Sequence, residues 1–248
     1  MQKFAYDREV FKIILMLLMV LDHISYFISP YLADTFHLIT RVVAVGFGYL
    51  VIEGLRYTHN KRNYLGRLFG WGIFMLIGNF IMNQFLKPEF QMSILGDNIF
   101  LTLFLGAIIV TLWESDNRRN KFIAFSMLLI GCIPLLEGSY LLLPFMFITN
   151  LNYDDVKRRD LSYLVLALFF AIIEISMTVP VIDFSSWLNI YDGIAMNASS
   201  MFFILIIPML HFYNGKQGRL GPKLKYLFYI FYPLHLWIIH LLANYVVK

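Results

Sequence analysis

Apolar stretches close to the length of a membrane-spanning helix recur along the whole chain, and short polar segments separate them. A helix needs about 20 largely apolar residues to cross the hydrocarbon core of a bilayer. The pattern therefore predicts about nine such helices, in an all-α polytopic membrane bundle that forms one domain. The predicted spans are residues 11–29, 37–55, 65–85, 97–113, 121–136, 139–150, 161–181, 196–212 and 226–246.

Basic residues collect in every second connection between these spans. Most of the 20 Lys and Arg residues lie before the first span or after the second, fourth, sixth and eighth. Cytoplasmic loops of membrane proteins carry an excess of Lys and Arg, so the pattern predicts a cytoplasmic N-terminus and an external C-terminus. The loop at residues 182–195 has no Lys or Arg and is predicted to lie outside.

Composition supports the membrane assignment and argues against a soluble domain or a nucleic-acid-binding protein. The 248 residues are 59% hydrophobic and only 15% charged, whereas a soluble domain carries about 25% charged residues. The net charge of +4 follows from the basic loops, so no nucleic-acid partner is expected. The lipid bilayer is the expected partner, in a multi-pass protein of the inner or plasma membrane. The single Cys132 excludes an intrachain disulfide.

Ionisable residues inside a bilayer are costly and mark functional sites by default. Lys12 and His23 in the first span are 11 residues apart, which is three helical turns on one face and about 16 Å of rise. This arrangement suits an elongated anionic cofactor that enters from the cytoplasm. Asp22 and His23 point about 100° apart and do not form a dyad. Asp22 is predicted to pair with Arg41, and the alternative reading is that this pair is purely structural.

Polar residues also gather at the cytoplasmic end of the second span. Glu53, Arg56, His59, Arg62 and Arg67 lie within 15 positions of one another. They could cradle phosphate groups. Alternatively, the basic residues set the topology only, with Glu53 neutralised by Arg56 or Arg67.

The last span carries a stripe of tyrosines, Tyr226, Tyr229 and Tyr232, followed by Pro233 and His235. Proline inside a helix frees the carbonyl four residues earlier. A kinked helix with polar side chains at this depth indicates a cavity that His235 faces. Aromatic packing alone is the competing explanation.

Three further ionisable side chains are placed less specifically. His37 and His240 are expected at the membrane interface, and Glu174 lies deep in its span without an identified partner. Sequence motifs for phosphate loops, zinc hydrolases, paired cysteines and serine hydrolases are absent, so no metal site is predicted.

These residues resemble those of the TraX family of integral membrane proteins, almost end to end. The segment Asp22-His23-Ile24, the pair Glu53-Gly54, the segment Tyr213-Asn214-Gly215-Lys216 and the run from Lys225 to Leu236 follow in family order. Residues 42–47 depart from the family, because a glycine and a proline found there in other members are missing.

The resemblance implies an enzymatic function. The activity named for the family is N-terminal acetylation of conjugative pilin, and the family is similar to membrane acyltransferases that use cytoplasmic acetyl-CoA. Those proteins place a cation and a histidine 11 residues apart in the first helix, as Lys12 and His23 are here. His23 would then be the general base, and Asp22 and Arg41 would orient it or stabilise the developing oxyanion.

The same resemblance assigns binding roles to the remaining candidates. The acceptor would be an amine or hydroxyl of a secreted or surface pilin, peptide or glycan. It would contact Glu53, His59, Tyr229, Tyr232 and His235. The acetyl-CoA phosphates would contact Lys12, Arg56, Arg62, Arg67, Lys216 and Lys223. Two alternatives stay open: a proton-coupled transporter, and a non-catalytic factor in pilus or envelope assembly.

Overall fold

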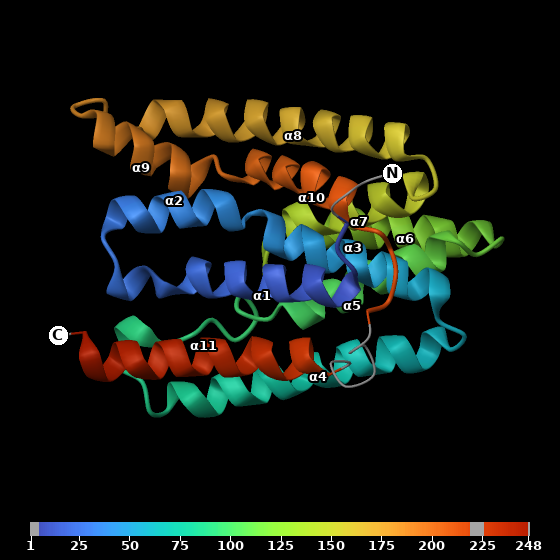
Figure 1. Cartoon of the computed structure of the whole chain (residues 1–248), viewed down its shortest axis with the longest axis horizontal. Coiled ribbons are helices and arrows are strands. Elements are labelled where there is room, and N and C mark those ends of the chain that lie inside the picture. The colour runs from blue at the N-terminus through green and yellow to red at the C-terminus, as the bar shows by residue number, and fades with distance from the viewer. Residues whose placement is uncertain (1–4, 219–225, 248) are drawn as a thin grey trace. The chain divides into compact units, whose positions relative to one another are not determined.

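The computed structural model describes residues 5–218 and 226–247. Every secondary-structure element assigned within these residues is an α-helix or a short 3-10 helix (Figure 1). The chain divides into two compact units, residues 1–43 with 160–248 and residues 44–159. The predicted all-helical class is confirmed. Helices α3 (Val42–Tyr57) and α8 (Val156–Thr178) each begin in one unit and continue into the other.

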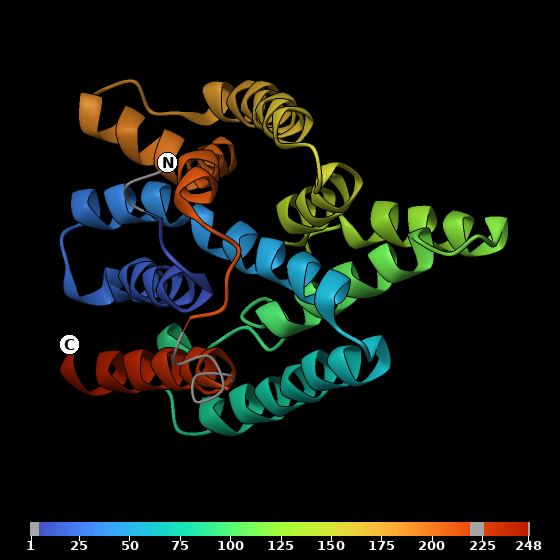
Figure 2. The ribbon, with the colours of Figure 1, turned by 45° about the vertical axis from the view of Figure 1, so that its right-hand side comes forward.

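The first unit stacks its helices side by side. In order, α9 packs on α2, α2 on α1, and α1 on α11 (Figures 1 and 2). Helices α1 and α11 are parallel, with their N-termini at the same end (Figure 1). The elements of this unit besides α8 are α1 (Arg8–His23), η1 (Ile24–Phe27), α2 (Pro30–Thr40), η3 (Val179–Val181), α9 (Trp187–Asn197), η4 (Ser200–Leu205), α10 (Ile206–Phe212) and α11 (Leu227–Val246).

The second unit is centred on α5 (Ile99–Trp113), which packs against α4, α6 and α7. Its side chains are apolar around the whole helix, as expected of a helix buried on every side. The remaining elements are α3, α4 (Lys61–Asn83), η2 (Pro88–Phe90), α6 (Arg118–Gly131) and α7 (Ser139–Asn152). Gly48 brings α3 against Leu142 and Met146 of α7.

Among the described residues, five helical segments are long and apolar enough to cross a membrane, or six if a bent pair is one span. The protein is therefore a multi-pass membrane protein. Helices α5, α6 and α7 have 15, 14 and 14 residues, which is about 22 Å or less of helix against about 30 Å of hydrocarbon. The predicted count of nine spans is accordingly not confirmed.

Two boundaries differ from the sequence prediction. The second span begins at Pro30 rather than at residue 37, because proline at the first helical position starts α2 after Ser29. The segment predicted as an outer loop, residues 182–195, is largely α9. Ser186 caps this helix by accepting a hydrogen bond from the backbone N–H of Asn189. The chain bends by 70° between helix α9 and the segment Ser200–Phe212.

Helices α4 and α5 approach closely at a glycine. A Cβ atom on Gly72 would lie 2.5 Å from a methyl of Leu101, and the Gly72 carbonyl accepts a 2.9 Å hydrogen bond from the buried amide of Asn98. Small residues allow membrane helices to pack at short range. Two residues earlier on α4, a Cβ on Gly70 would meet nothing within 4 Å.

We therefore expect Gly72→Val to separate α4 from α5 and to destabilise the protein by about 1–3 kcal/mol, the usual cost of overpacking. Gly70→Ala is the matched control and should leave the melting temperature in detergent unchanged or slightly higher, because alanine favours helix. Equal loss of stability in both variants would show that this contact does not set the helix spacing.

Candidate functional site

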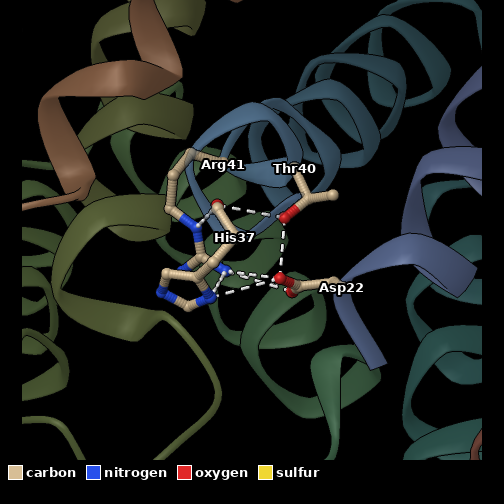
Figure 3. Close-up of polar contacts among 4 residues, drawn as sticks. All are labelled: Asp22, His37, Thr40 and Arg41. Carbon is tan, nitrogen blue, oxygen red and sulfur yellow. Dashed lines mark hydrogen bonds and ion pairs between the residues drawn. The ribbon is translucent and has the colours of Figure 1, made fainter. Parts of the chain in front are cut away.

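An ion-pair cluster joins the end of α1 to α2 (Figure 3). The Asp22 carboxylate accepts hydrogen bonds from Nη2 of Arg41 at 3.0 and 3.2 Å and from the Thr40 hydroxyl at 2.7 Å. Nδ1 of His37 lies 3.2 Å from both Asp22 Oδ1 and Arg41 Nη2. The predicted Asp22–Arg41 pair is confirmed.

Arg41 is held in place from a second direction as well. Its Nε donates to the His37 carbonyl at 3.0 Å, so the guanidinium is fixed by backbone and carboxylate together. Asp22 and Arg41 are each 22% exposed, and charges this poorly hydrated are stable only when they are paired. The cluster is therefore a lock between α1 and α2.

The lock determines the rotation of α1 about its own axis. Because neighbouring helical residues point about 100° apart, the orientation of Asp22 toward α2 leaves His23 to face another neighbour. That neighbour is α11: the rings of His23 and His235 have centroids 5.3 Å apart. Two histidines from opposite ends of the sequence are thus brought together within the first unit.

His235 is buried and tightly surrounded. It is 6% exposed, its ring stacks on Phe231 with an interplanar angle of 8°, and it meets the Tyr232 ring edge-on at 5.6 Å. Its Nδ1 lies 3.1 Å from the Phe231 carbonyl. Its Nε2 is buried without a hydrogen-bond partner among the described residues.

Only part of the tyrosine stripe of α11 contacts this histidine. Tyr232 is 1% exposed and contacts His235. Tyr229 is half-buried and packs on Tyr226 and Phe228 instead. Tyr232 therefore belongs to the immediate surroundings of the histidine pair.

A short backbone strap ties the segment before α1 to the segment after α10. Tyr6 donates to the Phe212 carbonyl and accepts from the N–H of Asn214, and Arg8 donates to the Lys216 carbonyl at 3.0 Å. The Glu9 carboxylate accepts from the N–H of Gly218.

The strap places Lys216 next to the first turn of α1. Lys216 is exposed, and Lys12, one turn beyond Arg8, is half-buried. Both predicted phosphate contacts therefore lie at the same end of the first unit, three turns from His23 along α1. Lys223 lies outside the described residues.

The candidates at the end of α3 and the start of α4 belong to the second unit. Buried Glu53 accepts a 3.3 Å hydrogen bond from the Tyr153 hydroxyl. Arg56 forms a 2.8 Å ion pair with Asp154, and its guanidinium lies 4.4 Å from the Tyr153 ring centroid. Helix α3 is thereby fastened to the end of α7.

The other basic candidates of the second unit are placed differently. Arg67 lies over the Tyr64 ring at 5.4 Å, and its Nε is buried without a hydrogen-bond partner among the described residues. Exposed His59 and Arg62 lie beside the Asn60 cap of α4.

Sequence reasoning missed several polar partners. His37, expected at the interface, and Thr40 belong to the Asp22 cluster, and the spacing of His37 from Arg41 by four residues could have indicated a shared face. Glu174 accepts from the N–H of Ser200 at 3.0 Å and so caps η4. His240 is buried beside Tyr26.

Comparison with known proteins gives two matches. A family model described as TraX protein matches residues 7–243. A probable fimbrial assembly protein of Dichelobacter nodosus, serogroup H1, is 25% identical over 235 residues, which is 91% of each chain. No solved structure matches this chain significantly.

Arg41→Ala should destabilise the protein by about 3 kcal/mol, because it leaves the Asp22 carboxylate poorly hydrated and without its cation. The double variant Asp22→Asn/Arg41→Gln removes both charges and should recover much of that loss in a thermal-unfolding assay. Arg158→Ala, which breaks an exposed ion pair with Asp155, is the control and should be neutral. Independent, additive effects of the two cluster substitutions would contradict the lock.

Proposed function

This protein belongs to the TraX family, and we propose that it is a membrane-embedded acetyltransferase. It moves an acetyl group from cytoplasmic acetyl-CoA to an amine or hydroxyl of a secreted or surface acceptor. The observation that carries this proposal is the His23–His235 pair, held 5.3 Å apart between α1 and α11, with Lys12 three turns away on the same helix. A histidine of the pair takes the proton of the acceptor, and the lysines bind the cofactor.

The cofactor fits the arrangement of charges in the first unit. Acetyl-CoA carries phosphates at one end and a thioester at the other, and Lys12 and His23 are separated by about 16 Å along α1. Lys216 is held at the same end as Lys12 by the strap. We assign the phosphates to these two lysines, whereas Arg56 is engaged by Asp154.

The acceptor is a pilus component or another surface molecule. The relative from Dichelobacter nodosus is named for fimbrial assembly, and pilin with a free N-terminal amine is the acceptor this name favours. The same name supports a second candidate function, a non-catalytic pilus assembly factor. That candidate requires neither acetyl-CoA binding nor the histidine pair.

Acetyl-CoA should raise the melting temperature of the detergent-purified protein. A ligand at 100 times its Kd adds about 2.7 kcal/mol to the stability of the folded state. Lys12→Ala and Lys216→Ala should reduce the shift, and dephospho-CoA should give a smaller shift than CoA. Lys87→Ala, on the connection between α4 and α5 in the second unit, is the control and should keep the full shift. No shift at millimolar acetyl-CoA would favour the assembly factor.

The proposal also fixes the orientation in the inner membrane. Cytoplasmic acetyl-CoA requires the strap and Lys216 to face the cytoplasm, as the basic loops predict. In a Cys132→Ser background, Ser185→Cys should react with a membrane-impermeant maleimide in intact cells, and Gln217→Cys only after permeabilisation. Both residues are exposed. The opposite labelling pattern would rule out cofactor entry at the strap.

A further inference from the structure

The hydrogen bond at His235 assigns the proton on its ring. The Phe231 carbonyl can only accept, so the Nδ1 that lies 3.1 Å from it carries the hydrogen. In a neutral imidazole the other nitrogen is then an unprotonated acceptor. That nitrogen, Nε2, is buried and has no hydrogen-bond partner among the described residues.

From this arrangement we infer that His235 Nε2, and not His23, accepts the proton of the attacking amine or hydroxyl, an assignment that rests on the proposed function. A buried acceptor without a donor is energetically unfavourable, and such a group in a native structure calls for a physical reason. A substrate N–H or O–H would supply the missing donor. Protonation of Nε2 in the absence of substrate would instead bury a charge without a partner.

The ring is also held as a general base requires. It stacks on Phe231 and meets Tyr232 edge-on, so the ring cannot rotate without losing both contacts. The hydrogen bond from Nδ1 fixes the tautomer in the way that a backbone carbonyl or a carboxylate does for other catalytic histidines. His235 therefore presents one unprotonated nitrogen, in one ring orientation, on a ring that lies beside His23 of α1.

His23 is suited to the complementary role. It is the last residue of α1, its ring lies beside that of His235, and its imidazole carries at least one N–H donor in either tautomer. We assign it as the donor that stabilises the carbonyl oxygen as negative charge develops there. The pair thus divides acceptance and donation between two histidines.

The reaction balances with these two residues and acetyl-CoA. The acceptor nitrogen or oxygen forms a bond to the thioester carbonyl carbon, and its proton passes to Nε2 of His235. The carbon–sulfur bond then breaks, and the CoA thiolate leaves with the electron pair. The proton on Nε2 moves to this sulfur, which releases CoA thiol and returns His235 to its starting form.

Two substitutions distinguish the histidine that accepts the proton from the histidine that donates a hydrogen bond. His235→Asn keeps an amide N–H at the position of Nδ1, and hence the bond to Phe231, but removes Nε2. His23→Gln keeps an N–H donor at the reach of the imidazole. In proteoliposomes with acetyl-CoA and a short peptide bearing a free N-terminal amine, His235→Asn should lower kcat about 10²–10⁴-fold, the usual contribution of a general base, with KM for acetyl-CoA unchanged.

His23→Gln should lower kcat by much less than His235→Asn, because an amide donates a hydrogen bond but is not basic. His211→Asn, at an exposed histidine that contacts Asp160, is the matched control and should keep wild-type kcat. A larger loss in His23→Gln than in His235→Asn would overturn the assignment and make His23 the base. Absence of transfer by the wild type to peptide and to an amino-sugar acceptor would reject the acetyltransferase function, and this assignment with it.

A measurement without turnover tests the tautomer itself. Nitrogen-15 NMR of histidine-labelled protein in bilayers, with the His235 signals identified by their loss in His235→Asn, should show a protonated Nδ1 and an unprotonated Nε2. A protonated Nε2 on His235 would contradict the assignment even if the wild-type protein transfers acetyl groups.

Discussion

The hydrogen-bonded ion pair between Asp22 and Arg41 is the interaction on which the site depends. Neither side chain is well hydrated, and a poorly hydrated charge is tolerated only beside its partner. The pair therefore permits one rotational setting of α1 against α2. Because His23 follows Asp22 in the sequence, that setting also turns His23 toward α11 and His235. A structural contact on one side of the helix thus determines which side chain α1 presents to α11.

The two ends of α1 carry different ionisable side chains, Lys12 near its start and His23 at its last residue. At the first turn, backbone hydrogen bonds from Tyr6 and Arg8 hold the segment that carries Lys216, so that Lys216 lies at the same end of α1 as Lys12. At the last turn, the lock presents His23. The helix between them sets their separation, about 16 Å along its axis, which is the distance that the proposed cofactor would have to span.

Much of this arrangement follows from the sequence alone, because membrane helices obey strong rules. Hydropathy predicts the helices, and the rarity of charges in a bilayer singles out Asp22, His23 and Arg41. Helical geometry separates Asp22 from His23 and predicts the pairing of Asp22 with Arg41, which the structure confirms. The resemblance to the TraX family is confirmed by a family model that matches residues 7–243.

Other features depend on contacts that no local pattern specifies. The neighbour of His23 is 212 positions away in the sequence and is determined only by the packing of α1 on α11. His37 and Thr40 have ordinary local signals and gain their role from the approach of Asp22. The strap pairs residues 6–9 with 212–218, and most of the predicted loop at residues 182–195 is helix α9, which begins at the Ser186 cap.

Cross-linking between positions 23 and 235 would establish whether the Asp22–Arg41 lock turns His23 toward His235. His23→Cys and His235→Cys, combined in a Cys132→Ser background, should be joined by a short bifunctional thiol reagent and detected as a linked peptide by mass spectrometry. Adding Arg41→Ala should largely abolish the link, whereas Leu17→Cys, on the exposed side of α1, should not link to position 235. No link in the paired variant, or a link that Arg41→Ala leaves unchanged, would show that the Asp22–Arg41 pair does not set the orientation of His23.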